Sequence, residues 1–474
     1  MRILTSATPL LAALTALNSA ALSQPKPFEG LTLFNTFDSE TAYLIELDGT
    51  VAHSWTGEGG PAMTPHLLPD GTLVRPAVVD NPFIQANGGG GRVQRIGWDG
   101  TVEWDFLYSS EDHLQHHDIV PMPNGNVLLV AWERKSHDEV IAMGHVSAVG
   151  ELWPTEIVEV QPDGPTGGII VWEWHLWDHL IQDVDPAKPN YGVVADHPEL
   201  LDVNYLDVNE GDWIHVNSID YNPQLDQIIF SSQFLCEIFI IDHSTTTEEA
   251  AGHTGGRYGM GGDFLYRWGN PQTYDRGGPE DQHFFGCHSA NWIDPGLPGE
   301  GNLIVFNNGN RPGDDDDYSS VEELVLPILP DGSYQLKDDA AFGPAEPAWL
   351  YDDPATFYGP FISGASRLPN GNTLVCEGPT GYLFEVTASG DTVWDHSCGG
   401  YVMRGYRYGP DYLEVPCAAD VTGDGTVDVL DLLEVLAQWD TSGRGGADIT
   451  GDGVVDVLDL LEVLAAWQRC GSEA

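Results

Sequence analysis

The sequence is poor in basic residues. Its 474 residues contain 18 Lys and Arg against 73 Asp and Glu, which gives a formal net charge of −55 at pH 7. Nucleic acids and anionic membrane surfaces are bound through basic patches, and a field of this sign repels both. The composition therefore argues against nucleic acid and anionic lipid as partners. An anionic substrate would need a local positive pocket.

Long apolar runs are also missing. The run Leu10 to Leu17 is too short and too interrupted to span a bilayer, and no membrane span is expected elsewhere. Arg2 before this run and Ala21-Leu22-Ser23 after it are typical of a secretory signal peptide. We therefore expect residues 1–23 to be a signal peptide and the protein to be secreted, periplasmic or bound at the cell surface.

Cysteine is scarce, with six residues in the chain. Disulfides are expected in an exported protein, and Cys417 and Cys470 bracket the C-terminal segment, so we expect these two to pair. Sequence alone leaves the pairing of the other four open: Cys236, Cys287, Cys376 and Cys398.

One short pattern recurs along residues 24–414. A polar or histidine-bearing stretch precedes a Pro/Asn/Gly turn and an apolar strand, and a Gly-x-x-x-Trp type segment follows later. Alternation and turn residues favour strands, and repetition indicates one structural unit used several times. Six such units predict a six-bladed β-propeller, with a sandwich or a solenoid as alternatives. The units start near these residues: Leu31, Thr64, His116, His215, Gly286 and Phe361.

The C-terminal segment, residues 417–472, contains two copies of a calcium loop. Oxygen ligands stand at positions 1, 3, 5, 9 and 12, a backbone carbonyl is expected at position 7, and an apolar helix follows each loop. The predicted ligands are Asp420, Thr422, Asp424, Thr426, Asp428 and Asp431, then Asp448, Thr450, Asp452, Val454, Asp456 and Asp459. The pair resembles a type I dockerin. That resemblance implies a small all-α module, bound calcium, and a cohesin-like or surface-anchoring partner.

Three histidine-bearing segments stand out in the propeller region. They are Trp172 to Leu180, Asp212 to Pro223 and Gly286 to Ile293, the last continuing through Arg311. Together with Ser363 to Gly378, they resemble the arylsulfate sulfotransferase family over roughly residues 30–412. The resemblance implies an exported six-bladed propeller without metal or nucleotide cofactor. It also implies transfer of a sulfuryl group from a phenolic sulfate ester to a phenol through a sulfohistidine.

The same resemblance assigns roles to individual residues. His288 is the expected nucleophile, with His215 as the second catalytic histidine, and Asn217 and Arg311 are expected to bind the sulfuryl oxygens. His117 is a further candidate for substrate binding, from its place in the repeat rather than from the resemblance. The residue types suit the chemistry, because neutral imidazole is a good nucleophile near pH 7 and arginine compensates negative oxygens.

The sequence departs from the family at one point. No histidine stands in residues 361–365, where the nucleophile of other members is expected, and Ala290 replaces an expected asparagine. Either the nucleophile is His288 or His215, or this branch performs different chemistry. Two other classes therefore stay open: a non-catalytic ligand-binding propeller displayed through its dockerin, and a quinone-dependent dehydrogenase-like propeller suggested by the Gly-x-x-x-Trp segments.

The remaining histidines are expected to serve structure. His66 and His243 are interpreted as hydrogen-bonding residues, and His175 and His179 as packed ones. Transition-metal binding in the propeller is not expected, because no tight ligand spacing is present. The acidic run Asp314 to Asp317 is interpreted as a solvated loop.

Overall fold

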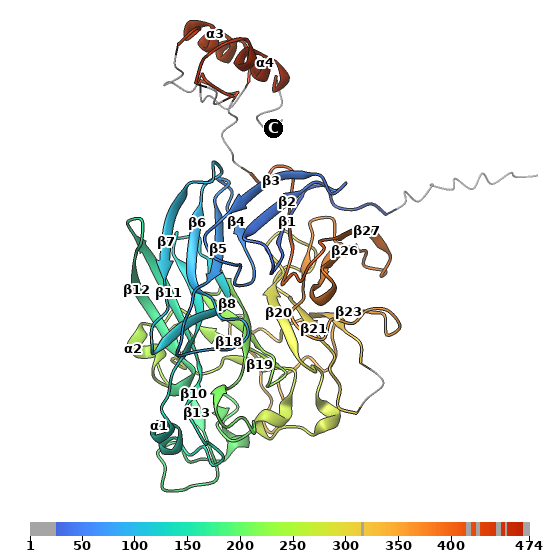
Figure 1. Ribbon diagram of the computed structural model, residues 1–474. Coiled ribbons are helices and arrows are strands. Elements are labelled where there is room, and N and C mark those ends of the chain that lie inside the picture. The colour runs from blue at the N-terminus through green and yellow to red at the C-terminus, as the bar shows by residue number, and fades with distance from the viewer. Residues whose placement is uncertain are drawn as a thin grey trace, which may run out of the picture.

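The computed structural model describes residues 25–313, 317–413, 419–422, 427–441, 447–450 and 453–467. Within them, six four-stranded antiparallel sheets follow one another around the molecule, as the colour order in Figure 1 shows. The predicted six-bladed β-propeller is confirmed. The signal peptide, the run at residues 314–316, Cys417 and Cys470 lie outside the described residues.

Each blade has four strands, whose order runs from the innermost to the outermost. Blades 1 to 3 are β28 (Tyr406–Tyr408), β1 (Leu31–Asn35), β2 (Thr41–Ile45) and β3 (Val51–Thr56); β4 (His66–Leu67), β5 (Leu73–Val78), β6 (Gly91–Ile96) and β7 (Val102–Leu107); and β8 (His113–Pro121), β9 (Val127–Glu133), β11 (Thr155–Asp163) and β12 (Gly167–His175). Blades 4 to 6 are β16 (Val216–Asn222), β17 (Gln227–Ser232), β18 (Glu237–Asp242) and β19 (Tyr266–Trp268); β20 (Cys287–Trp292), β21 (Leu303–Asn307), β22 (Ser320–Leu324) and β23 (Trp349–Asp352); and β24 (Gly364–Arg367), β25 (Thr373–Glu377), β26 (Tyr382–Val386) and β27 (Thr392–Ser397).

Short elements decorate the connections between these strands. They are the parallel pairs β10 (Leu152–Trp153) with β15 (Gly211–Asp212) and β13 (Leu180–Ile181) with β14 (Leu201–Asp202), the helices α1 (His137–Ala142) and α2 (Thr247–Ala250), and the 3-10 turns η1 (Leu176–Asp178), η2 (Val194–Asp196), η3 (Pro271–Tyr274), η4 (Pro279–Asp281) and η5 (Gly378–Thr380).

Blade 1 is closed by the two ends of the propeller sequence. The C-terminal strand β28 pairs antiparallel with β1, with Leu31 opposite Tyr408. Leu31 therefore begins the second strand of a blade, and its expected place at the start of a unit was wrong for this blade alone. A ring needs such a joint, because an open ring would leave two unpaired strand edges.

The Gly-x-x-x-Trp type segments form the outer strands, where their indoles connect neighbouring blades. Five of these tryptophans donate Nε1–H to an acceptor of the next blade or its loops. The bonds are Trp104 to Gly167 O (2.8 Å), Trp172 to Thr245 Oγ1 (3.1 Å), Trp268 to Pro344 O (2.8 Å), Trp349 to Ala388 O (3.0 Å) and Trp394 to Leu47 O (2.7 Å). A buried indole needs such an acceptor, so the repeated tryptophan fixes the spacing of the blades.

The four cysteines described by the structure, Cys236, Cys287, Cys376 and Cys398, are free thiols. Among the described residues, no helix is long and apolar enough to cross a bilayer.

The C-terminal module contains two helices of identical sequence, α3 (Val429–Ala437) and α4 (Val457–Ala465). Each begins at a capping aspartate, Asp428 or Asp456, whose side chain accepts a hydrogen bond from the second residue of the helix. A small valine and alanine core joins the helices and includes Val435 and Val463. Figure 1 draws this pair of helices beyond the blades.

Candidate active site

Histidines preceding or within three inner strands meet at the centre of the propeller. The rings of His117 and His215 lie 4.6 Å apart in a T-shaped contact. His117 and His288 are 3% and 1% exposed, whereas the side chain of His215 is 13% exposed. Burial, opposed by the hydrogen bond to Asn308 and reinforced by nearby His215 and Arg404, lowers the pKa of His288 to about 3. Burial and the same neighbours also hold the pKa of His117 well below its usual value. His117 and His288 are therefore neutral at ordinary pH.

Asn308 fixes the orientation and tautomer of His288. The Asn308 amide donates to the carbonyls of Gly359 (2.6 Å) and Ile362 (3.0 Å), so its Oδ1 must accept. That oxygen lies 2.6 Å from His288 Nδ1, which therefore carries the proton. In the neutral ring, the lone pair is then on Nε2, which makes no protein hydrogen bond within the described chain. A neutral imidazole with a free lone pair is the form of histidine that can act as a nucleophile.

His215 is oriented in the same way by a carboxylate. Its Nδ1 donates to Asp212 Oδ2, and Asp212 Oδ1 accepts from the Trp132 indole at 2.9 Å. The ring also stacks on Phe234, with centroids 4.9 Å apart, and Phe234 is 40% exposed. A base held by a carboxylate is the arrangement that general acid–base catalysis requires. The exposed phenyl ring offers a surface for an aromatic group.

His117 is also held through Nδ1, in this case by a second histidine. His116 Nδ1 lies 2.8 Å from His117 Nδ1, and His116 stacks on Trp132 at 3.9 Å. A side chain at Gly88 would collide with the His117 ring at 2.1 Å, so glycine is required there. His117 and His215 both have φ of +51°, a costly conformation for a residue with a side chain. Such strain is common where a site dictates the direction of a side chain.

A buried ion pair that the sequence analysis missed lies beside these histidines. Arg404, in the segment before β28, donates to Asp118 Oδ2 at 2.7 Å and to Asn217 O at 3.2 Å. Both charged side chains are buried, and Arg404 Nε has no partner within the described chain. The signal was present in the sequence. Arg404 precedes the strand that closes the ring, a place that the repeat makes equivalent to the histidine-bearing segments.

Asn217 and Arg311, which were predicted to bind the sulfuryl oxygens, form hydrogen bonds with other parts of the protein. The Asn217 amide donates to Cys287 O (2.8 Å) and accepts from Ser231 Oγ (2.6 Å), so it links blades 4 and 5. Arg311 donates to Tyr318 O at 2.8 Å and stacks on the Tyr318 ring at 3.9 Å, in the loop between β21 and β22. Among the described residues, neither side chain forms a hydrogen bond with, or stacks on, the rings of His117, His215 or His288.

Blade 6 lacks an imidazole at the corresponding place. Ser363 has φ of +85°, is fully buried, donates to Phe361 O (3.2 Å) and accepts from the Gly378 backbone (3.0 Å). These bonds are local to the blade. The blade therefore contributes structure rather than a titratable group at this point.

The predicted calcium ligands partly lie in described segments of the C-terminal module. The Asp431 and Asp459 carboxylates accept backbone bonds from their own loops, at Thr422 and Thr450 among others. Asp448 Oδ1 is buried and has no hydrogen-bond partner in the described chain. A buried carboxylate oxygen of this kind fits a cation ligand. The remaining predicted ligands Asp424, Thr426 and Asp452 lie outside the described residues.

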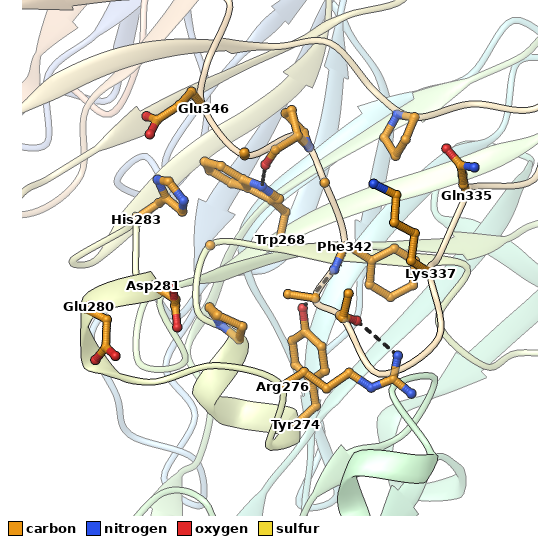
Figure 2. Close-up of a pocket in the computed structure, with 18 residues that line it drawn as sticks. Trp268, Tyr274, Arg276, Glu280, Asp281, His283, Gln335, Lys337, Phe342 and Glu346 are labelled. Carbon is orange, nitrogen blue, oxygen red and sulfur yellow. Dashed lines mark hydrogen bonds between the residues drawn. The ribbon is translucent and has the colours of Figure 1, made fainter.

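A surface pocket of about 710 Å³ lies away from the central histidines, between blade 4 and the loops of blade 5. Figure 2 shows Glu280, Asp281 and Glu346 on one side of it and Lys337 on the other. The Arg276 guanidinium donates hydrogen bonds to the carbonyls of Ala195 and Ala340. Opposite charges therefore line this pocket without converging, and none of the predicted propeller residues lines it.

Comparison with known families identifies both parts of the chain. The model of the arylsulfotransferase (ASST) family matches residues 100–397, more than half of the sequence. The chain belongs to the arylsulfotransferase family. The type I dockerin model matches residues 418–466, and modules of this kind typically bind calcium, associate with cohesins and are extracellular or on the cell surface. No match was found among curated proteins.

Solved structures resemble this arylsulfotransferase family member only remotely. A protein of unknown function from Bacteroides caccae shares 11% identity at a TM-score of 0.42, covering 80% of this chain and 98% of that one. The periplasmic gluconolactonase of Pseudomonas aeruginosa shares 13% identity at 0.39, covering 80% and 98%. Virginiamycin B lyase from Staphylococcus aureus shares 12% at 0.35, covering 79% and 83%. These scores carry no functional argument.

Proposed function

We propose that the propeller transfers a sulfuryl group from an aryl sulfate to a phenol through a sulfohistidine at His288. The observation that carries this proposal is the Asn308 contact, which leaves the lone pair of the neutral imidazole on Nε2. Of the two candidate nucleophiles, His288 is the one without a carboxylate partner. His215, paired with Asp212, suits proton transfer better than attack.

Each half-reaction balances with these two histidines. His288 Nε2 bonds to sulfur as the sulfur–oxygen bond to the aryl group breaks, and protonated His215 gives its Nε2 proton to the departing phenolate. A phenol acceptor then loses its proton to His215 and attacks the sulfur, and the bond to His288 Nε2 breaks. Donor and acceptor use the site in turn, so the kinetics are ping-pong.

The sulfuryl oxygens stay negative throughout and need positive or donating groups. Arg404 and His117 lie beside the histidines and take this role in our proposal. Asn217 then acts by positioning, through the carbonyl that accepts from Arg404. Arg311, in its partly exposed loop, is assigned the attraction of the anionic donor rather than the transfer itself.

The decisive experiment incubates the protein with a chromogenic aryl sulfate and no acceptor, then maps the modified residue by mass spectrometry. One sulfuryl group adds about 80 Da, and we expect it on His288, as for other covalent intermediates. Addition of a phenol should remove the label and release the sulfated acceptor. A label on another residue would refute the assignment of His288, and absence of both label and phenol release would refute the enzyme proposal.

The 1% exposure of His288 favours a second candidate, a propeller that binds aryl sulfates without turning them over. A bound donor must reach Nε2, and that requires local opening around His215, the more exposed ring. Calorimetry that detects aryl sulfate binding to a protein that releases no phenol would select this alternative. Release with a burst of one equivalent would exclude it.

The C-terminal module is proposed to bind calcium and to hold the exported enzyme on a cohesin-bearing surface or complex. Both helices repeat the same exposed apolar positions, as a partner-binding face requires: Val429, Leu430, Leu433, Leu436 and Trp439, then Val457, Leu458, Leu461, Leu464 and Trp467. A calcium chelator should abolish binding to a cohesin and unfold this module, with turnover by the propeller unchanged. Cohesin binding that survives chelation would refute the calcium role.

A further inference from the structure

A second group of histidines lies outside the active site, where the segment after blade 3 meets a loop of blade 4. His179 follows η1, while His253 and Asp263 belong to the connection between β18 and β19, just after α2 (Figure 1). One ligand atom from each of these three residues lies within 4.8 Å of the other two. His179 and Asp263 are buried, whereas the side chain of His253 is 60% exposed.

The tautomer of His179 is fixed by the backbone. Its Nε2 lies 2.9 Å from Ala250 O, and a carbonyl only accepts, so Nε2 carries the proton. The neutral ring therefore has its lone pair on Nδ1. That atom lies 2.7 Å from Asp263 Oδ1, which is also an acceptor. Two acceptors this close require a cation, either a proton or a metal ion.

His253 adds a second imidazole to the same oxygen. Its Nδ1 lies 2.8 Å from Asp263 Oδ1, so one carboxylate oxygen faces two ring nitrogens. No Lys or Arg of the described chain forms an ion pair with Asp263. The Asp263 carboxylate thus has no lysine or arginine partner among the described residues, although Asp263 is only 5% exposed.

The pocket around His179 is built closely. A Cβ at Gly262 would lie 2.0 Å from Ala250 O and 2.6 Å from His179 Nε2, so only glycine fits against this bond. Trp174 stacks on His179 with rings 5.5 Å apart and donates to Gly262 O at 2.7 Å. A histidine that donates its remote nitrogen to a carbonyl is oriented as metal-ligating histidines usually are.

We propose that His179, His253 and Asp263 bind a transition-metal dication of the zinc class. Two imidazole nitrogens and one carboxylate oxygen suit zinc and its neighbours, whereas calcium and magnesium prefer oxygen ligands throughout. The exposed side of His253 leaves the remaining coordination positions to water. The ion would tie the glycine-rich loop at residues 251–263 to the segment after blade 3. This departs from our expectation of a propeller without metal, and it is independent of the sulfuryl-transfer proposal.

A second cluster of possible metal ligands, with two carboxylates and one histidine, serves as a contrast. Glu133, Glu156 and His175 also lie within ligand distance of one another. There, Lys135 lies 2.6 Å from Glu133, and His113 lies 2.7 Å from Glu156. Those carboxylates already have cationic partners from the protein, so this second cluster is accounted for as an ion-pair network.

The test uses the full chain, stripped with a chelator and returned to saturating calcium so that the C-terminal module stays folded. Zinc binding is then measured by calorimetry and by metal analysis after dialysis. We expect wild type to hold one tight equivalent more than His253→Ala, with affinity at this site lowered on the order of a hundredfold. His253 is exposed, so this variant should fold. Asp263→Asn should lose the same equivalent.

His137→Ala is the matched control, because His137 is an exposed histidine whose ring lies 3.3 Å from Ala148 O outside the cluster. It should bind zinc as wild type does. Cobalt(II) in place of zinc should give visible absorption bands that His253→Ala abolishes. If wild type binds no tight equivalent of zinc, a proton alone explains the short distance between His179 Nδ1 and Asp263 Oδ1, and the proposal fails. Equal loss in His137→Ala would mean non-specific imidazole binding and would also refute it.

Discussion

Two buried histidines at the centre of the propeller, His117 and His288, differ from His113 and His243, which contact carboxylates. Burial, reinforced by nearby His215 and Arg404, lowers the pKa of His288 to about 3, and its Nδ1 partner is a neutral amide. Between blades 3 and 4, burial also lowers the pKa of His243, but the hydrogen bonds that its ring donates to Asp226 and Glu159 outweigh this effect and raise the pKa to about 9. The hydrogen bond to Glu156, against a smaller effect of burial, likewise raises the pKa of His113.

The difference shows how one residue type serves two purposes in one repeat fold. Carboxylate partners turn His113 and His243 into cations that join strands, whereas burial and the neighbouring His215 and Arg404 keep His117 and His288 neutral. Neutral imidazole is the form that can attack sulfur. A site that needs a nucleophile must therefore keep carboxylates away from it, even in a chain with 73 acidic residues.

Removing one histidine of each kind should separate the two roles most strongly. His288→Ala should lower kcat for aryl sulfate hydrolysis or transfer at least about a thousandfold, as for loss of other covalent nucleophiles. His243→Gln should leave kcat within about twofold, because it keeps a polar side chain far from the centre. Steady-state kinetics with a chromogenic donor measures both. Comparable losses in the two variants would break the comparison.

Arg404→Met tests the one permanent cation among the central groups. The change leaves Asp118 buried without its partner, which should destabilise the fold by about 3 to 5 kcal/mol. The double variant with Asp118→Asn should recover much of this loss, since both charges are then gone. Urea unfolding gives the free energies. If the double variant is as unstable as the single one, the pair is not the cause.

The contribution of His243 to the free energy of unfolding should depend on pH in a predictable direction. The pKa of His243 is about 9 in the folded protein and about 6.5 in an unfolded chain, so its contribution is complete below pH 6.5 and is lost as pH rises through 9. Between pH 6 and pH 9.5, wild type should lose about 2 to 3 kcal/mol more unfolding free energy than His243→Gln. Parallel curves for the two proteins would show that His243 is not charged in the native state.

Much of this architecture follows from local sequence. The turn that precedes each second strand and the tryptophan that ends each unit predicted six blades, and both patterns have local physical causes: turn geometry and the need of a buried indole for an acceptor. His215 and His288 were chosen as catalytic candidates because they stand at repeated positions and carry the family motifs. The calcium loops were found because their ligands follow one another closely in sequence.

The remainder depends on contacts between distant segments. Arg404 meets Asp118 across 286 positions of sequence, and Asn308 reaches His288 from the next strand. The repeat marks the position of Arg404, but no local pattern gives the partner that either Arg404 or Asn308 meets in the folded chain. For Asn217 and Arg311, the sequence gives the positions but not the hydrogen bonds to Cys287 O and Tyr318 O, and their predicted role in binding the sulfuryl oxygens stays a prediction.

The smallest and sharpest test converts a central histidine toward the carboxylate-bound kind. Asn308→Asp would place a carboxylate beside His288 Nδ1 and remove the donors to Gly359 and Ile362. The pKa of His288 should rise, so protonation should inactivate the nucleophile at higher pH. With a pKa near 7, kcat/KM at pH 6 should fall about tenfold relative to pH 8, whereas wild type should show no such acidic limb.

Asn310→Asp is the matched control for this last change, because Asn310 lies two positions away and bonds Pro360 O and Tyr358 rather than a histidine. Its pH profile should follow wild type. Since Asn308→Asp also removes two buried donors, its folding must be checked by circular dichroism before the profiles are compared. A folded Asn308→Asp enzyme with an unchanged acidic limb would mean that the amide does not set the protonation of His288, and that the nucleophile must be sought at His215.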